Sequence, residues 1–363
     1  MTERRLDIHP DMRCAETPPA WLYRDPRVQE RLAETVFARS WQLALDESEV
    51  PAPQGSKPFV LLPGALDEPL VATRDDGRLR CLSNVCTHRA MCVAEGPSST
   101  AGLRCRYHGR RFGLDGRFRS APGFENALDF PRPADDLGEH PMPKVGPYLF
   151  TSLDPEVSFD RFWGPVEARC GHLPWDRLVR DRTCDCTFRI RAHWALYVEN
   201  YLEGLHIPFI HPGLTATLDW KQYAYELHDL GILQLALAAE GESAFDDLPS
   251  GHPDHGRQVA AWYWWLFPNL MVNVYPWGVS INVVEPRGTS ECEVRFQTYV
   301  WDESKRGEGA GGDLVTVELE DEAAVVSVQR GLAARAYHRG RYAPDHELGT
   351  HHFHRMLAER LDS

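Results

Sequence analysis

The sequence predicts an α+β protein: a small all-β part with two metal-binding loops, and a larger part in which helices cover a curved antiparallel sheet. Two observations indicate this fold. Residues 42–155 hold short strand-like runs between turn signals, whereas residues 156–363 combine long strand-like runs with helical patterns. We therefore expect domains over 42–155 and 156–363, and an N-terminal helical segment over 1–41 that packs on the larger domain.

The elements expected before residue 156 are short. An apolar stripe from Leu32 to Trp41 recurs at helical spacing and indicates a helix over about 26–38. Asp75-Asp76-Gly77 is expected to be a hairpin turn, and residues 117–130 have the composition of a loop. Strand-like runs occupy 58–62, 69–73, 79–83 and 148–152.

The elements expected after residue 156 are longer. Short segments containing Pro separate successive strand-like runs, which is typical of an antiparallel sheet. Two helices are expected near the C-terminus, over 315–335 and 350–362. The strand-like runs are 230–237, 259–267, 270–275, 279–284 and 292–300.

Composition excludes several classes of partner. The net formal charge of −14 disfavours nucleic acid and anionic membranes, because both require a basic patch. No apolar run is long enough to span a bilayer, and the first residues lack the apolar segment of a secretory signal. The nine cysteines are not spaced as a disulfide framework, which fits a reducing compartment, so we expect a cytoplasmic protein.

Two short boxes, Cys86-Thr87-His88 and Cys105-Arg106-Tyr107-His108, each offer one thiolate and one imidazole. Four such ligands suit a [2Fe–2S] cluster in which two histidines replace two cysteines on one iron. A structural Cys₂His₂ zinc site is the alternative, although zinc fingers usually group their cysteines in one half-site and their histidines in the other.

A second candidate metal site contains His206 and His211. On an ideal helix, residues five apart point about 140° away from each other, so a shared metal requires a distortion, for which Pro208 lies in a suitable place. Two histidines and one carboxylate form the facial triad of non-haem Fe(II) oxygenases. Glu203 is either the third ligand or a group that orients His206, and two ordinary packed or surface histidines are the alternative.

Three motifs resemble those of Rieske non-haem iron oxygenase α subunits, and the similarity covers most of the chain, from about Trp21 to Leu357. His108 to Gly116 is similar to the end of the second Rieske box, although the family often has Trp at Arg110 and Pro at Arg106. Residues 203–211 resemble the family's Asp/Glu-x-x-His-x₄-His signature, and residues 320–332 resemble its Glu-Asp-x₇-Gln-Arg-Gly-Leu pattern. Among members of the family, the choline- and betaine-type oxygenases have sequences that are most similar to this chain.

The resemblance implies a role for each site residue. Cys86, His88, Cys105 and His108 hold a Rieske [2Fe–2S] cluster. His206, His211 and Asp321 hold mononuclear Fe(II), with Glu320 and Glu322 as alternatives to Asp321, and Asn200 lines that site. Glu203 bridges a cluster-ligating histidine of one subunit to an iron-ligating histidine of the next, which implies a homotrimer.

The implied activity is that of a terminal oxygenase component. The chain has no convincing Gly-x-Gly-x-x-Gly, so electrons from NAD(P)H are expected through a separate reductase or ferredoxin. The expected reaction is mono- or dioxygenation of a small organic substrate, aromatic or alkyl. Two alternatives stay open: oxidative N-demethylation or monooxygenation of a quaternary ammonium compound, and a Rieske electron carrier with a ligand-binding domain.

Aromatic residues in the strands could build an apolar pocket or a cation-binding cage, or belong to the core. These residues are Trp262, Trp264, Trp265, Phe267, Tyr275 and Trp277.

Overall fold

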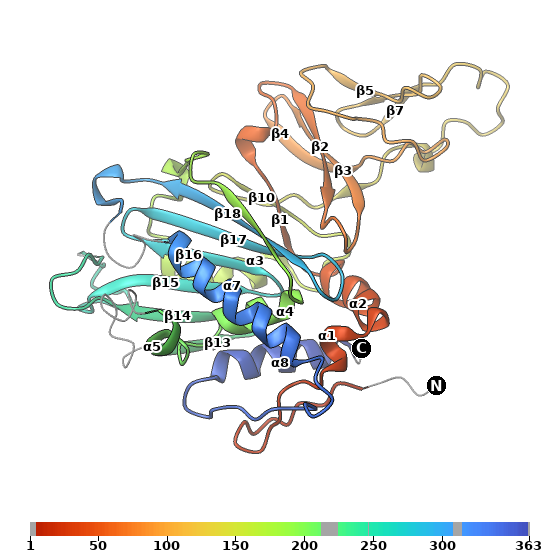
Figure 1. The fold of residues 1–363 in the computed structure, drawn as a ribbon. Helices are drawn as coiled ribbons and strands as arrows, with labels where there is room; N and C mark the ends of the chain where they lie inside the picture. The colour runs from red at the N-terminus through yellow and green to blue at the C-terminus, as the bar shows by residue number, and fades with distance from the viewer. Residues whose placement is uncertain (1–4, 212–223, 246, 308–313, 362–363) are drawn as a thin grey trace. The chain divides into compact units, whose positions relative to one another are not determined.

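The computed structural model describes residues 5–211, 224–245, 247–307 and 314–361, with the backbone alone for 314–316. The chain forms two compact units, Trp41–Pro155 and the combination of Met1–Ser40 with Glu156–Ser363 (Figure 1). Pro212, which directly follows His211 and is a residue type that can end a helical segment, lies outside the described residues. None of the described helices is long and apolar enough to cross a membrane.

The smaller unit is all-β, as expected. The predicted hairpin is confirmed: Asp75 pairs with Arg78, and the two residues between them, Asp76 and Gly77, have φ of 49° and 78°. Part of 117–130 is a strand and not a loop, because Phe118 pairs with Phe112 and packs on its ring. The first sheet has the order β1 (Gln42–Asp46), β10 (Tyr148–Thr151) and β9 (Lys144–Val145). The second has the order β2 (Gly55–Leu61), β3 (Glu68–Asp75), β4 (Arg78–Ser83) and β8 (Glu139–His140). The third has the order β5 (Gly102–Arg104), β6 (Arg111–Gly113) and β7 (Phe118–Ser120).

An eight-stranded sheet dominates the larger unit, and its strand order runs β11-β18-β17-β16-β15-β14-β13, with β12 also paired to β18. The five predicted strand runs are confirmed, while β11, β12 and β13 have no counterpart among them. The strands are β11 (Val179–Arg180), β12 (Cys186–Ile190), β13 (Ala224–His228), β14 (Gly231–Leu237), β15 (Val259–Leu266), β16 (Leu270–Tyr275), β17 (Gly278–Pro286) and β18 (Cys292–Val300).

Helices cover both faces of this sheet, and β15 shows how alternation divides them. Trp262 and Trp264 point toward the side of α3 (Phe159–Cys170), where His172 packs edge-on against Trp262. Tyr263 and Trp265 point toward the other face, where Trp265 packs on Phe353. That face is covered by α4 (Trp194–Tyr201), α7 (Leu314–Gly331) and α8 (Leu348–Leu361), and Figure 1 shows α7 crossing it.

The N-terminal helix is present close to its expected bounds. After the short α1 (Trp21–Arg24), α2 (Pro26–Leu32) starts at Pro26 with the Asp25 side chain accepting a hydrogen bond from the Arg27 N–H, and it continues as a π-helical turn to Phe37. The Phe37 ring packs edge-on against Trp194 of α4 at 4.9 Å, so this segment belongs to the core of the larger unit.

Candidate metal centres

The two Cys/His boxes of the smaller unit form turns of the same geometry. The Cys86 carbonyl accepts a hydrogen bond from the Ala90 N–H, and the Cys105 carbonyl accepts one from the Gly109 N–H. Ala90 and Gly109 both have left-handed φ, 55° and 75°. In the second turn, Gly109 adopts this conformation without strain because it has no Cβ atom. In the first turn, the same conformation is adopted by Ala90. Each turn therefore presents its Cys and its His from one tight, backbone-bonded loop.

The four box residues differ in exposure in a way that fits a Rieske-type cluster. Cys86 and Cys105 are 3% and 2% exposed and belong to an apolar cluster, while His108 is exposed and its ring lies 4.7 Å from that of His88. Burial, with Cys105 alongside, raises the pKa of the Cys86 thiol, so a positively charged centre between the sulfurs is what would favour its thiolate. Two buried sulfurs, a half-buried His88 and an exposed His108 match a cluster with its histidine iron near the surface.

Arg110 lies behind these turns and is 2% exposed. Its guanidinium donates to Thr87 Oγ1 at 2.6 Å, pairs with Asp135 at 3.2 Å, and lies 5.1–5.3 Å from the ring centroids of Phe118, Phe124 and Phe130. The departure at this position from the family's usual Trp therefore places a buried, paired cation beside the boxes. Sequence reasoning noted the departure but not this role.

We expected one distorted helix to carry both histidines of the larger unit, but the structure has two separate helices here. α4 ends at Tyr201, and a separate single turn, α5, spans Ile207–Ile210. His206 precedes this turn and His211 follows it, so Pro208 lies in the first helical turn, where no N–H is required. The two rings are thereby brought to a centroid distance of 5.2 Å, at 79° to each other.

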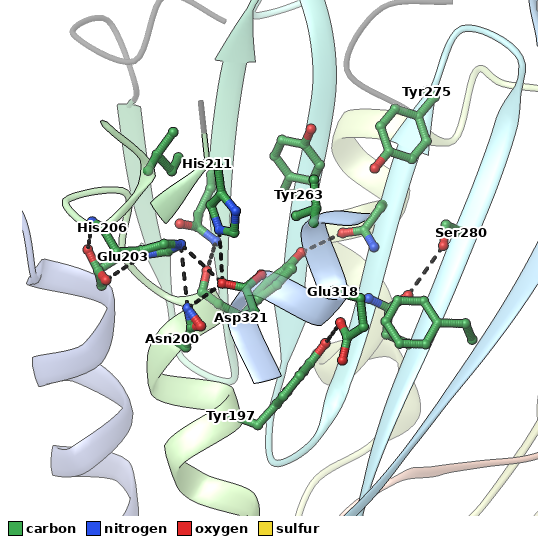
Figure 2. Close-up of a pocket in the computed structure, with 17 residues that line it drawn as sticks. Tyr197, Asn200, Glu203, His206, His211, Tyr263, Tyr275, Ser280, Glu318 and Asp321 are labelled. Carbon is green, nitrogen blue, oxygen red and sulfur yellow. Dashed lines mark hydrogen bonds and ion pairs between the residues drawn. The ribbon is translucent and has the colours of Figure 1, made fainter. Parts of the chain in front are cut away.

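Asp321 of α7 completes the group. His211 Nε2 is 2.9 Å and His206 Nε2 is 3.6 Å from Asp321 Oδ1, and one potential ligand atom from each of the three residues lies within 4.8 Å of the others (Figure 2). Among the described residues this is the one group of three His, Cys, Asp or Glu side chains that meets this distance. Two imidazoles and one carboxylate on one side fit a ferrous ion with open positions opposite.

Two further carboxylates orient the imidazoles. Glu203 Oε1 lies 2.6 Å from His206 Nδ1, and Glu320 Oε2 lies 2.7 Å from His211 Nδ1. Each carboxylate accepts a hydrogen bond from Nδ1–H and leaves the Nε2 lone pair free for a metal. Glu203 and Glu320 thus lie behind the histidines and do not join the group as third ligands, and Glu322 is absent from it as well.

Asn200 of α4 lies between two members of the group. Its Nδ2 donates to Asp321 Oδ1 at 2.8 Å and lies 3.4 Å from His206 Nε2. This contact agrees with the expectation that Asn200 lines the site. It also occupies one lone pair of Asp321 and so restricts the carboxylate's rotation.

The group opens into a pocket of about 850 Å³, mouth included. Of the six strand aromatics proposed for a pocket, only Tyr275 lines it; Trp277 stacks on Tyr275 from outside. The other four are buried in the core, with exposures of 2% or less. The lining is Tyr197, Asn200, Tyr201, Glu203, His206, Ile207, His211, Gln234, Tyr263, Asn273, Tyr275, Ser280, Asn282, Phe296, Val317, Glu318 and Asp321.

Sequence reasoning missed most of this lining. Two signals were available: Tyr263 alternates with Trp262 and Trp264 along one strand, and Glu318 lies one helical turn before Asp321. Both signals become useful only when the face that bounds the pocket is known.

Sequence comparison identifies both units. The profile of the ring hydroxylating alpha subunit (catalytic domain) matches residues 175–363, and that of the Rieske [2Fe-2S] domain matches residues 40–131. The chain belongs to the Rieske ring-hydroxylating α-subunit family. It is therefore an oxidoreductase and the terminal component of a Rieske-type oxygenase, with a Rieske [2Fe–2S] cluster and a mononuclear iron, and neither a zinc-stabilised module nor a simple electron carrier.

Relatives of this oxygenase extend over nearly its whole length. Choline monooxygenase of Arabidopsis thaliana is 30% identical, with 96% of this chain and 83% of that protein covered. The carnitine monooxygenase oxygenase subunit of Escherichia coli is 28% identical, with 97% of both covered. The fold matches the quaternary ammonium monooxygenase CntA with L-carnitine (TM-score 0.75, 22% identity, 98% and 99% covered) and a Rhodococcus naphthalene 1,2-dioxygenase (TM-score 0.72, 18% identity, 95% and 94% covered).

Proposed function

We propose that this chain is the oxygenase component of a quaternary ammonium monooxygenase. The two sequence relatives named above are a choline and a carnitine monooxygenase, and they favour this alternative over the aromatic or alkyl substrate that the motifs first led us to expect. The observation that carries the proposal is the pocket beside the histidines, whose lining combines tyrosines, amides and a buried carboxylate. An aromatic hydrocarbon requires an apolar wall, whereas an ammonium cation is attracted by ring faces and by negative charge.

The residues present fit both cofactors. Cys86, His88, Cys105 and His108 hold the cluster, and His206 Nε2, His211 Nε2 and Asp321 hold the ferrous ion. When bound, these groups use O₂ with two electrons and two protons to insert one oxygen atom into a C–H bond of the substrate and release the other as water. Electrons come from a separate NAD(P)H-dependent reductase, directly or through a ferredoxin.

The chain's own side chains orient the site and bind the substrate. Glu203 and Glu320 keep the Nε2 lone pairs of the histidines directed at the metal position, and Asn200 restrains Asp321. Tyr263 and Tyr275 meet edge to face, with centroids 5.9 Å apart, and provide aromatic surface to N-methyl groups.

We further propose that the active assembly is a homotrimer in which Glu203 links two copies. His108 is exposed, so it can approach the Glu203 carboxylate of a second copy, which already accepts a hydrogen bond from His206. At saturating Fe(II), Glu203→Gln is expected to retain both cofactors yet lose about 100-fold in turnover, because the amide cannot accept hydrogen bonds equally from two imidazoles. Normal turnover would exclude the link.

The substrate proposal is tested by single turnover. The protein with both cofactors is reduced, mixed with ¹⁸O₂ and choline, carnitine or naphthalene, and the products are analysed by mass spectrometry. Incorporation of one ¹⁸O atom into a product of choline or carnitine, or release of formaldehyde from an N-methyl group, supports the proposal. Oxygenated naphthalene with no product from either ammonium compound would contradict it.

A further inference from the structure

The pocket beside the histidines contains buried polar atoms that have no hydrogen-bond partner. Among its described lining residues these atoms are Asn200 Oδ1, Gln234 Oε1 and Glu318 Oε1. All three are acceptors. A buried acceptor without a donor costs stability, so the pocket suits an occupant that brings positive charge or hydrogen-bond donors.

The orientation of both amides is set by their nitrogens. Gln234 Nε2 donates to the Tyr201 carbonyl at 2.7 Å, and Asn200 Nδ2 donates to Asp321 Oδ1 at 2.8 Å. Turning either amide over would place its oxygen against an acceptor. The unpartnered oxygens are therefore a property of the packing and not of an arbitrary amide assignment.

Glu318 is the ionisable member of this set, and a cation beside its carboxyl group would favour the ionised form. It is 4% exposed, and its Oε2 accepts a hydrogen bond from the Tyr197 hydroxyl at 2.5 Å, while its Oε1 has no partner. The charged groups that act on it most strongly, Asp321 and Glu322, are acidic, and no Lys or Arg belongs to the described lining. Burial, reinforced by these two acids, raises the pKa of Glu318 to about 8.

The position of Glu318 relates it to the reacting centre. It precedes Asp321 by three residues on α7, so the two side chains are neighbours on one face of the helix. Figure 2 shows the Asp321 carboxylate directed toward His211 and Asn200 and the Glu318 carboxylate directed toward Tyr197, with Tyr263 and Tyr275 above them. Both acidic residues line the same pocket. A cation held by Glu318 thus has its carbon substituents about one helical turn from the iron-binding carboxylate.

We propose that Glu318 is the residue that selects a cationic substrate, by placing its free carboxylate oxygen against the positive head group while the ring of Tyr263 or Tyr275 contacts the opposite side. This inference rests on the proposed function, because it assigns the recognition of the ammonium group to one side chain. Tyr197 holds the other carboxylate oxygen and so orients the first toward the pocket.

The test separates charge from shape. Choline and 3,3-dimethylbutan-1-ol have nearly the same shape, but only choline carries a charge. Their dissociation constants are measured by calorimetry on the protein with both cofactors, for the natural chain and for Glu318→Gln. We expect the substitution to weaken choline binding about tenfold or more, and to change binding of the neutral alcohol less than about twofold. Equal changes for the two ligands, or unchanged choline binding, would overturn the role of Glu318.

The same measurements distinguish failure of this inference from failure of the proposed function. If the natural chain binds the neutral alcohol as tightly as choline, the quaternary ammonium proposal itself is wrong. If the natural chain prefers choline and Glu318→Gln keeps that preference, only the assignment to Glu318 is wrong. Tyr197→Phe removes the hydrogen bond that orients the carboxylate but keeps the carboxylate itself, so we expect it to reduce the preference for choline less than Glu318→Gln does.

Discussion

The two metal-binding regions of this oxygenase are assembled in opposite ways. The proposed cluster ligands lie within 86–108, and each Cys/His pair shares one tight turn closed by a backbone hydrogen bond. In the iron site, His211 meets Asp321 from 110 residues away, and neither α5 nor α7 positions the group without the other. Local geometry therefore defines the first region, whereas packing of distant elements defines the second.

Electrostatics separates the two regions further. Beside the cluster boxes, the buried Arg110 is neutralised by Asp135. Around the iron site, Glu203, Glu318, Glu320 and Asp321 gather in the described structure without a Lys or Arg among the pocket residues. This difference indicates that contacts within the cluster loops maintain their shape, whereas the iron site requires a bound cation to balance the negative charge of its carboxylates.

The largest expected effect is loss of the cluster while the mononuclear iron site stays intact. Cys105→Ser should abolish the cluster, because a hydroxyl does not replace a thiolate ligand, while the mononuclear iron stays bound. Iron and acid-labile sulfide analysis should fall from three irons and two sulfides per chain to one iron and none. Cys92→Ser, in the segment that follows the first box, is the control and should keep all three irons; loss of the cluster there as well would show that the Cys/His turns are not the self-sufficient elements described.

The reciprocal substitution should affect only the iron site. Asp321→Ala removes one of the three proposed ligands, so we expect Fe(II) affinity to fall at least about 100-fold with the cluster's visible absorption unchanged. Titration of the iron-free site measures it. Glu322→Ala, one residue along α7, is the control with expected affinity close to that of the natural chain. A larger loss in the control would reassign the ligand to Glu322.

A smaller effect is expected from the carboxylate behind His211. Glu320→Gln removes the charged acceptor on Nδ1 and is expected to lower Fe(II) affinity about 10- to 100-fold, less than loss of Asp321. The same titration measures it. An effect equal to that of Asp321→Ala would indicate that Glu320 is itself a ligand.

The smallest effect concerns stability and pH. In the folded chain the pKa of Glu318 is raised from 4.5 to about 8, so between these values the folded state binds more protons than the unfolded state and stability falls as pH rises. Glu318→Gln removes this dependence. In iron-free protein the variant should therefore gain about 1.4 kcal/mol relative to the natural chain for each pH unit within that window, and nothing below it. Denaturant unfolding at pH 5, 6 and 7 measures the difference, and a constant difference would contradict the buried, cation-free setting of Glu318.

The contrast between local turns and distant elements also explains which parts of the two sites could be predicted from the sequence. The cluster boxes were recognisable because ligands two or three residues apart in a turn need no tertiary information. The proposed iron ligands His206, His211 and Asp321 were found through motif resemblance. The distortion expected at Pro208 was wrong, since α4 ends at Tyr201 and a separate helix, α5, starts at Ile207, before this proline. The sequence left the strand aromatics open between pocket and core, because a run such as 262–265 contributes to both faces of a sheet.

The sequence by itself determined the two-part α+β architecture, the paired turns and the family, since these depend on short-range spacing and on periodicity. Only the tertiary structure decided which carboxylates lie behind the histidines, which tyrosines reach the pocket and that Glu318 is buried with one oxygen unpaired. These outcomes depend on how α4, α5 and α7 pack on one face of the sheet, and a linear pattern does not specify which side chains from separate elements will meet.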